Sequence, residues 1–310
     1  MASSGLKSGL SSGILQGVKT GLGLASSRSG LLSGITNDLS IKNKMQNPVL
    51  LASARSSCPF FYWNSENVTL SGSNVTVVDN LLNTFNPLYE TTESSLSVVS
   101  DPLYVPKSVF NNRASIQFDT TDTFTTGNSG VPSMANASEM TLIMVCKPIS
   151  TTRSILFWKQ DTASGTFPTV GDLSVEFDGT NVDVIFTGNP TTQTATYTTK
   201  NPMLKDNWFI LTVKARLSLP NGPGSCIDLF INGTRDRVLV SDTITSLPIV
   251  ATNKWVNGFI NFGNNGYSTS PGTLGGNNYI AAGLIIEEWI NETEQLRLEN
   301  YFRWYYGYNF

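Results

Sequence analysis

From residue 48 onward the chain alternates β-branched or aromatic residues with polar ones, in short runs closed by Gly, Asn, Asp or Pro. This alternation predicts β-strands separated by turns. Asn232-Gly233 supplies the positive φ angles of a tight hairpin between two such strands. The runs are VTLSGSNVTVV, RASIQFD, MTLIMVCKPI, LSVEFDG, VDVIFTG, TATYTT, FILTVKARL, CIDLFINGT and FINFG. Many short strands with little helical periodicity predict an all-β sandwich or jelly roll.

One helix is predicted, close to the C-terminus of the sequence. Asn291 is a suitable N-cap, and Glu294 three residues later completes a capping box. Gly307 stands where a helix needs a left-handed C-terminal residue. The apolar stripe expected to dock on the sandwich follows a spacing of i, i+3, i+4 and i+7 and consists of Leu298, Tyr301, Phe302 and Tyr305.

The first residues follow a different pattern, with glycine at every fourth position and an aliphatic residue directly after each glycine. The glycines are Gly5, Gly9, Gly13, Gly17 and Gly21. Such a stripe allows a second backbone to approach closely, although each helical glycine costs about 1 kcal/mol relative to alanine. A flexible linker or a disordered tail is the alternative, but either would leave the regularly spaced aliphatics exposed. We therefore predict an assembly anchor at 1–47 and a β-sandwich domain at 48–310.

Charge is distributed unevenly between these two parts. The net charge of the 310 residues is −3. Residues 1–45 carry five basic residues and one acid, which leaves 15 basic and 22 acidic residues in the remainder. An acidic body lacks the clustered basic stripe of a nucleic-acid-binding face. No apolar run approaches the ~20 residues of a membrane span, so neither nucleic acid nor membrane is expected as a partner.

The chain contains no histidine. This excludes Ser-His-Asp and Cys-His catalysis and histidine-based zinc sites. The three cysteines have neither metal-binding spacing nor a disulfide framework, and we interpret them as small apolar core residues; they are Cys58, Cys146 and Cys226.

Several blocks of the body resemble the concanavalin A-like lectin/glucanase family in its laminin-G-like form, which is common in phage and bacterial surface proteins. The resemblance covers about residues 50–310 and rests on FYWNSENVTLSGSNVTVVDN, PLYVPKSVFNNRASIQFDTTDTF, DNWFILTV, CIDLFINGT and NYIAAGLIIEEWINETEQLRLENYFRWYYGY. It implies a concanavalin A-like jelly-roll β-sandwich with one C-terminal helix. The family often has Asp at the position of Asn64.

The same fold includes glycosidases that use an E-x-D-x-x-E strand, in which paired carboxylates act as acid and nucleophile. This chain offers EFDGTN, with Glu176 and Asp178 in place and Asn181 at the position of the acid. An amide cannot donate a proton as a carboxylic acid does. We therefore predict that the protein is not an enzyme.

The resemblance also implies calcium as a candidate ligand, because family members often hold this ion in loops at one end of the sandwich. Asp119 and Asp122 in FDTTDTF are the candidate ligands, and Asp178 and Asp183 form a second pair. Their ligand density is below that of a dedicated calcium loop. Turn-forming aspartate is the alternative, and no cofactor is predicted.

Glycan binding would use exposed aromatic rings and asparagine-rich loops, and the best candidate is the segment GNNGYSTSPGTLGGNNY, residues 263–279. A long ordered connection without a ligand is the alternative. The candidate ligand-binding residues are Tyr267, Asn277, Asn278 and Tyr279.

An anchor followed by a laminin-G-like head suits a virion structural protein of a tailed phage, located at the particle surface. Our first hypothesis is a capsid decoration or head-fibre protein with weak adhesion to host glycan. A tail-tip or tail-fibre protein that recognises host glycan is the alternative, and a glycoside hydrolase is a third. The expected partners are other virion proteins, bound through the anchor, and further copies of the same chain.

Overall fold

The structure is a computed structural model, and it describes residues 45, 47–48, 60–82, 95–119, 122–125, 137–150, 154–160, 172–187, 194–202, 205–217, 226–244, 259–263 and 278–307. The predicted anchor, with its glycines from Gly5 to Gly21, lies outside these residues. Tyr267 and Asn277 lie outside them as well. Every element described below belongs to the unit Asn47–Phe310.

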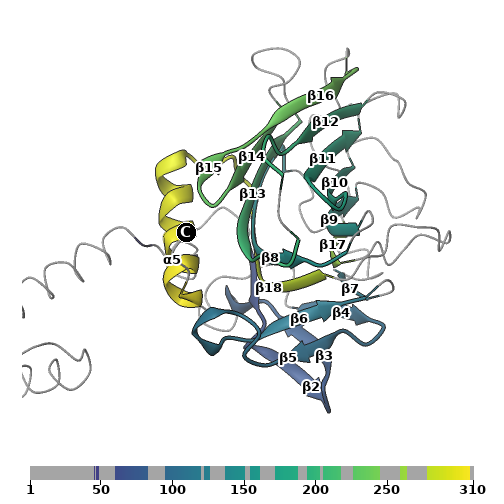
Figure 1. The fold of residues 1–310 in the computed structure, drawn as a ribbon, viewed down its shortest axis with the longest axis vertical. Coiled ribbons are helices and arrows are strands. Elements are labelled where there is room, and N and C mark those ends of the chain that lie inside the picture. Colours follow the sequence, from purple (N-terminus) through teal and green to yellow (C-terminus); the bar gives the residue numbers. More distant parts are fainter. Residues whose placement is uncertain are drawn as a thin grey trace, which may run out of the picture. The chain divides into compact units, whose positions relative to one another are not determined.

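Two antiparallel sheets form the body (Figure 1). In sheet A, β18 pairs with β8 along one side and with β1 and β6 along the other. Phe60 of β1 lies opposite Ile286 of β18. The strands of sheet A are β15 (Thr234–Arg235), β14 (Ile227–Ile231), β13 (Phe209–Arg216), β8 (Glu139–Pro148), β18 (Asn278–Ile286), β1 (Phe60–Asn64), β6 (Ser115–Phe118), β5 (Leu103–Val105), β3 (Asn74–Asp79) and β2 (Val68–Ser71).

Sheet B lies against the other face of the core. Its strands, in spatial order, are β16 (Val238–Asp242), β12 (Thr194–Thr198), β11 (Val182–Thr187), β10 (Leu173–Phe177), β9 (Ser154–Gln160), β17 (Phe259–Gly263), β7 (Thr123–Thr125) and β4 (Ser95–Val99). Strand β4 also pairs with β3 and so joins the two sheets at one edge. The predicted all-β sandwich with one C-terminal helix is confirmed.

Alternation along the strands builds the core between the sheets. In β10, Leu173, Val175 and Phe177 are fully buried in this core, and Val175 lies opposite the core residue Val184 of β11. Successive strand residues point to opposite faces, so Ser174 and Glu176 lie on the face of sheet B that is turned away from the core.

A close approach of two aromatic rings explains a glycine in β18. A Cβ atom on Gly283 would lie 2.5 Å from Phe262 Cε1 and 2.5 Å from Trp63 Nε1. Trp63 is fully buried, and its ring centroid lies 5.4 Å from that of Phe262. Only a residue without a side chain allows the indole to reach this depth of the core.

The predicted hairpin at Asn232-Gly233 is confirmed. These residues connect β14 and β15 with φ angles of 51° and 78°. Positive φ at both central residues is the geometry of the type I′ turn, which matches the twist of the flanking strands. The Asn232 side chain also accepts a hydrogen bond from the backbone N–H of Ile210, at 2.8 Å.

The predicted helix is α5 (Glu292–Tyr306), and both of its predicted caps are present. The Asn291 side chain accepts a hydrogen bond from the backbone N–H of Glu294, at 2.9 Å. Gly307 ends the helix in the left-handed region at φ 69°, and η1 (Phe110–Asn112) lies beside this end. No helix among the described residues is long and apolar enough to cross a membrane.

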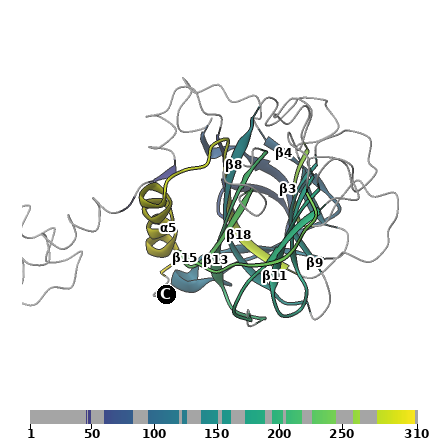
Figure 2. The same ribbon diagram turned by 90° about the horizontal axis from the view of Figure 1, so that it is seen from above.

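The stripe by which α5 docks differs from the predicted one in two residues. Leu298 and Phe302 are buried as predicted, whereas Tyr301 and Tyr305 are only half-buried, and Tyr306 is buried in their place. The hydroxyl of Tyr306 donates to the backbone carbonyl of Ala281, at 2.8 Å. Figure 2 shows α5 beside sheet A, with sheet B beyond it. A second apolar cluster fills the space between α5 and sheet A.

Polar groups are buried in this second layer as well. Glu299 is fully buried, and one carboxylate oxygen accepts hydrogen bonds from Thr212 Oγ1 at 2.7 Å and Gln295 Nε2 at 2.8 Å. Lys214 Nζ donates to the backbone carbonyl of Ile290, at 2.7 Å. Burial raises the pKa of Glu299 and lowers the pKa of Lys214, because both groups have lost water that would stabilise their charges.

We expect Glu299→Gln to stabilise the protein at neutral pH, by on the order of 1 kcal/mol. Glu299 has a raised pKa in the folded state, so the folded protein binds this proton more tightly than the unfolded chain does. The contribution of Glu299 to stability therefore falls as pH rises from its ordinary pKa of 4.5 through the raised value. Chemical denaturation across this pH range should show that difference between wild type and variant. The exposed Glu292→Gln is the control, and parallel profiles for wild type and Glu299→Gln would contradict the expectation.

Candidate functional site

The two described residues of the predicted glycan loop lie in strand β18. Asn278 is fully buried, and it accepts a hydrogen bond from Ser154 Oγ at 3.2 Å and donates one to the backbone carbonyl of Ile155 at 3.1 Å. Tyr279 is half-buried, and its hydroxyl donates to Gln117 Oε1 at 3.1 Å. Lys147 Nζ lies 4.4 Å from the centroid of the Tyr279 ring. Both side chains therefore make contacts that hold the sandwich together.

The candidate calcium ligands Asp119 and Asp122 organise the backbone before β7. Asp122 is buried, and its carboxylate accepts hydrogen bonds from the backbone N–H groups of Asp101, at 3.2 Å, and Asp119, at 2.9 Å. Burial raises the pKa of Asp122. The Asp119 side chain is exposed. Across the part of the chain that the structure describes, no three His, Cys, Asp or Glu residues are grouped so as to hold a metal ion.

The EFDGTN segment divides between strand β10 and the turn that follows it. Glu176 is buried in β10 and accepts a hydrogen bond from Ser174 Oγ, at 2.8 Å. Asp178 lies beyond the strand and accepts hydrogen bonds from the backbone N–H groups of Thr180, at 2.7 Å, and Asn181, at 2.6 Å. This is an Asx turn, so the Asp178 carboxylate closes a turn.

A row of polar side chains crosses the outer face of sheet B. The register places Asn261 of β17 opposite Thr125 of β7 and opposite Trp158 of β9, and Trp158 opposite Ser174 of β10. We call these four residues the Asn261 row. All four are buried, and their neighbours along each strand, such as Phe262 and Phe157, point into the core. Polar side chains are therefore gathered on the face opposite the core.

Asn261 differs from the other buried amides described above. Its side chain is fully buried, and within the described part of the chain neither Oδ1 nor Nδ2 has a hydrogen-bond partner. A buried polar group without a partner costs roughly 1–3 kcal/mol, and the great majority of such groups are paired in native proteins. An amide offers two donors and an acceptor, so the side chain of Asn261 has unused hydrogen-bonding capacity.

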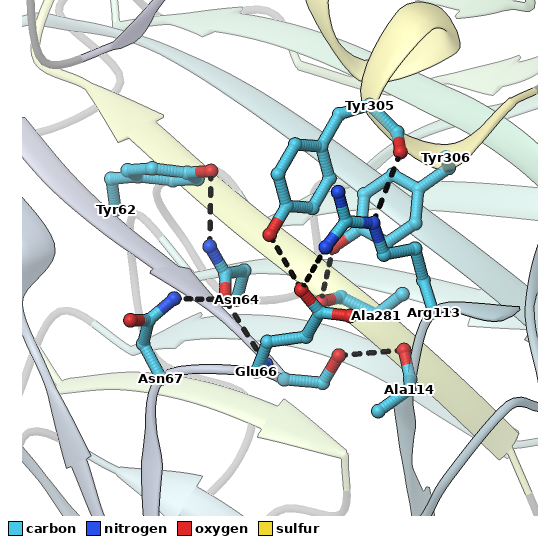
Figure 3. A network of polar contacts seen from close by, with 10 residues as sticks. Tyr62, Asn64, Glu66, Asn67, Arg113, Ala114, Ala281, Tyr305 and Tyr306 are labelled. Atoms are coloured by element: carbon cyan, nitrogen blue, oxygen red, sulfur yellow. Dashed lines mark hydrogen bonds and ion pairs between the residues drawn. The ribbon is translucent and has the colours of Figure 1, made fainter. Parts of the chain in front are cut away.

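The family that the sequence resembles often has aspartate at the position of Asn64. Here both ends of the Asn64 side-chain amide form hydrogen bonds with neighbouring residues (Figure 3). Its Oδ1 accepts hydrogen bonds from the backbone N–H of Glu66, at 3.0 Å, and from Asn67 Nδ2, at 2.7 Å. Its Nδ2 donates to the hydroxyl of Tyr62, at 3.4 Å. A carboxylate could not make this last contact as a donor, so the amide fits this position.

A second group in Figure 3 connects the turn after β1 with helix α5. One carboxylate oxygen of Glu66 accepts hydrogen bonds from Arg113 NH1, at 2.5 Å, and from the hydroxyl of Tyr305, at 2.7 Å. The guanidinium carbon of Arg113 lies 4.1 Å from the centroid of the Tyr305 ring. All three side chains satisfy one another, so this network stabilises the docking of α5 and leaves little capacity for a ligand.

Sequence reasoning therefore missed the Asn261 row. The segment FINFG was predicted as a strand, and asparagine is depleted in strands. That depletion is the one local signal at Asn261, since the absence of a hydrogen-bond partner depends on strands that are distant in sequence.

No protein-family model and no curated protein sequence matches the chain. Among solved structures the chain is similar to a sialidase of Trypanosoma rangeli, with 10% identity over 77% of this chain and 32% of that one and a TM-score of 0.42. It is also similar to the binding domain of botulinum neurotoxin serotype D, with 10% identity over 79% of this chain and 51% of that one and a TM-score of 0.45. The chain is also similar to domain 4 of an extracellular arabinanase from Geobacillus stearothermophilus, in complex with arabinotriose. The identity is 13% over 77% of this chain and 98% of that one, and the TM-score is 0.43.

The chain thus spans about a third of the sialidase chain and about half of the neurotoxin chain. With TM-scores below 0.5, none of these likenesses carries an argument about function. The assignment of a β-sandwich rests on the strand ladders of the chain itself.

Proposed function

We propose that the chain is a virion structural protein, of capsid decoration or head-fibre type, that displays a non-catalytic glycan-binding β-sandwich at the particle surface. The virion role rests on the glycine stripe from Gly5 to Gly21, whose spacing favours close packing against partner chains. Attachment to the particle through residues 1–47 would leave the sandwich free to meet a host surface.

The observation that carries the glycan-binding role is the amide of Asn261, for which the described residues supply no hydrogen-bond partner. In the Asn261 row this amide lies next to the indole of Trp158. Ser174 is the next residue of the row, and it is hydrogen-bonded to Glu176. Sugars carry vicinal hydroxyl groups and apolar ring faces, and sites for such ligands combine a few placed polar groups with aromatic rings.

A non-catalytic role is favoured over glycoside hydrolysis by the chemistry of EFDGTN. Asp178 is engaged in an Asx turn, and Asn181 supplies no acid. The E-x-D-x-x-E set of this strand therefore lacks its acid, and the carboxyl group that does lie opposite Glu176, Asp183 of β11, is not part of that set. Turnover of any oligosaccharide by the purified protein would contradict this part of the proposal.

We expect Asn261→Leu to lower glycan binding at least tenfold while leaving the free energy of unfolding unchanged or raised. Leucine is close in shape to asparagine and removes a buried amide that has no partner, and such a replacement is nearly neutral or stabilising. Binding of the full chain is measured on an array of neutral hexose and N-acetylhexosamine oligosaccharides, and stability is measured by chemical denaturation.

Asn64→Leu is the matched control, because it removes a buried amide whose hydrogen bonds are satisfied. That variant should lose about 1–3 kcal/mol of stability and keep its binding. If wild type retains no oligosaccharide on the array, or if Asn261→Leu binds as wild type does, glycan recognition by the Asn261 row is excluded.

Copy number separates the capsid role from the tail role. A decoration protein on an icosahedral shell is present in hundreds of copies, whereas a tail tip or fibre of low rotational symmetry holds about a dozen or fewer. Quantitative mass spectrometry of purified particles, with the major capsid protein as the internal standard, measures this ratio. Absence of the chain from particles would contradict both roles.

A further inference from the structure

A row of side chains crosses the outer face of sheet A, on the side that carries α5. Tyr279 of β18 lies between Lys147 of β8 and Gln117 of β6. Leu103 of β5 lies opposite Gln117, and Trp208 lies at the other end, with Lys147 Nζ 5.6 Å from its ring centroid. We call these five residues the Tyr279 row. Neighbouring strands are about 4.8 Å apart, so the row spans roughly 19 Å, a length that suits an extended ligand rather than a single ion.

Most of the Tyr279 row is open to solvent. Leu103 is 41% exposed, and Lys147, Tyr279 and Gln117 are half-buried. Trp208 is the buried member of the row. The row differs in this respect from the Asn261 row, whose four residues are all buried, and it can therefore meet a large ligand at the surface.

Two side chains of the row have donors that the described part of the chain leaves unused. Lys147 Nζ lies 4.4 Å from the centroid of the Tyr279 ring, and no described residue accepts a hydrogen bond from it. Gln117 accepts the hydrogen bond of the Tyr279 hydroxyl through Oε1, while its Nε2 has no acceptor among the same residues. An ammonium group and an amide NH₂ group are thus available to a ligand that carries acceptor oxygens.

Positive charge gathers at the Trp208 end of the row. Trp208 Nε1 donates, at 3.2 Å, to the backbone carbonyl of the residue that follows Lys107. Lys205 lies three residues before Trp208, and both of these lysines are exposed. Lys147 is the third cation. Among the direct sequence neighbours of the three lysines, Asp206 is the one acidic residue, so this end of the row is locally basic in a body that is acidic as a whole.

The arrangement of the rings disfavours a nucleic acid as the ligand. Single-stranded nucleic acids bind by stacking their bases on open aromatic faces. In the Tyr279 row Lys147 Nζ lies over both rings, and Trp208 is buried. The apolar surface that remains belongs to Leu103 and to the exposed part of Tyr279, and it suits the C–H face of a sugar ring.

We propose that the Tyr279 row binds an extended acidic saccharide. The charged group of the saccharide forms a charge-assisted hydrogen bond with Lys147, and its hydroxyl groups accept hydrogen bonds from the amide of Gln117. Leu103 contacts an apolar face of a sugar ring. The exposed Asp119 follows β6 beyond Gln117, so the acidic group is placed at the Trp208 end, among the three lysines.

This site is separate from the Asn261 row, because it lies on the other sheet and selects a charged ligand. Neutral oligosaccharides are the probes for the Asn261 row, and acidic ones are the probes for the Tyr279 row. A failure of neutral binding would leave the Tyr279 row untouched, and the two proposals are tested independently.

Lys147→Met tests the site in the full chain. Methionine keeps an unbranched apolar side chain against the two rings and removes the ammonium group. Binding of tetragalacturonate, measured by isothermal titration calorimetry, should weaken at least about tenfold, because a hydrogen bond to a charged group is lost. Lys200→Met, at an exposed lysine outside the row, is the control and should bind as wild type does. Sulfated and phosphorylated tetrasaccharides are titrated in parallel, because a lysine ammonium acts as a point charge.

Gln117→Glu tests the site without removing a contact of the two rings. The new carboxylate still accepts the hydrogen bond of Tyr279, but its charge repels an acidic ligand. Binding of tetragalacturonate should fall at least about tenfold, while the midpoint of urea denaturation stays unchanged. The neutral methyl ester of tetragalacturonate should bind wild type at least about tenfold more weakly than the acid does.

Three results would overturn the proposal. The first is that wild type binds none of the carboxylated, sulfated and phosphorylated probes. The second is that the methyl ester binds as tightly as the acid, or that Lys147→Met and Gln117→Glu both bind the acid as wild type does. The third is that an oligothymidylate of similar length binds as tightly as tetragalacturonate, which would assign the row to a nucleic acid.

Discussion

Replacing Phe302 with alanine is expected to destabilise the protein by about 3–5 kcal/mol. The side chain is 1% exposed, and its ring centroid lies 6.0 Å from that of Tyr62 in an edge-on arrangement. Leu298 and Tyr306 belong to the same apolar cluster. Alanine would remove the ring and leave a cavity beneath α5, and a single helix resting on a sheet can close such a cavity only in part.

Trp304→Ala is the control for this prediction. Trp304 lies on the same helix but is 60% exposed, so its removal should change the free energy of unfolding by no more than about 0.5 kcal/mol. Urea denaturation of both variants measures the difference. Similar losses for the two substitutions would show that helix propensity, rather than burial against sheet A, determines the effect.

Replacing Gly13 and Gly17 together with leucine is expected to abolish incorporation of the protein into particles. Leucine is the better helix former, so the substitutions should raise helicity in residues 1–47. Bulky side chains on the glycine stripe would nevertheless hold a partner backbone away. The amount of variant that copurifies with particles, relative to wild type, is the measurement.

Ser11→Leu is the matched control, because position 11 lies on the opposite side of a helix from the glycine stripe. That variant should be incorporated normally. Wild-type incorporation of the double glycine variant would instead identify residues 1–47 as a linker, since a linker tolerates added bulk.

Local chemistry was sufficient to predict the elements whose geometry is set within a few residues. Asn232-Gly233 adopts positive φ angles because these two residue types tolerate them. Asn291 caps α5 because its side chain reaches the N–H three residues later. Strands such as β8 and β10 were predictable because their apolar residues alternate or run continuously between turn residues.

The orientation of α5 could not be predicted in the same way. Apolar periodicity favoured Tyr301 and Tyr305 for the buried face, but the helix buries Tyr306 and the polar residue Glu299. This orientation depends on two residues of sheet A. Thr212 donates a hydrogen bond to Glu299, and the backbone carbonyl of Ala281 accepts one from Tyr306. Such partners are distant in sequence, so no local pattern records them.

The candidate site was even less accessible to sequence reasoning. Asparagine-rich segments drew attention to Asn278, which the structure ties to Ser154 and the backbone of Ile155. Asn261 lies in a strand pattern that is otherwise ordinary. Whether a buried amide is paired depends on the neighbouring strands, and only the three-dimensional arrangement distinguishes the satisfied Asn278 from the unsatisfied Asn261.

The pairing of β1 with β18 constrains the order in which the body can fold. Phe60 lies opposite Ile286, so two adjacent strands come from distant parts of the chain. Contacts of such long sequence separation slow folding, because chain entropy is lost before the contacts form. During synthesis β8 also lacks one of its two neighbours until β18 has emerged, and unpaired strand edges favour aggregation. The yield of folded protein therefore depends on how soon β18 reaches β1 and β8, and not on the stability of the finished sandwich alone.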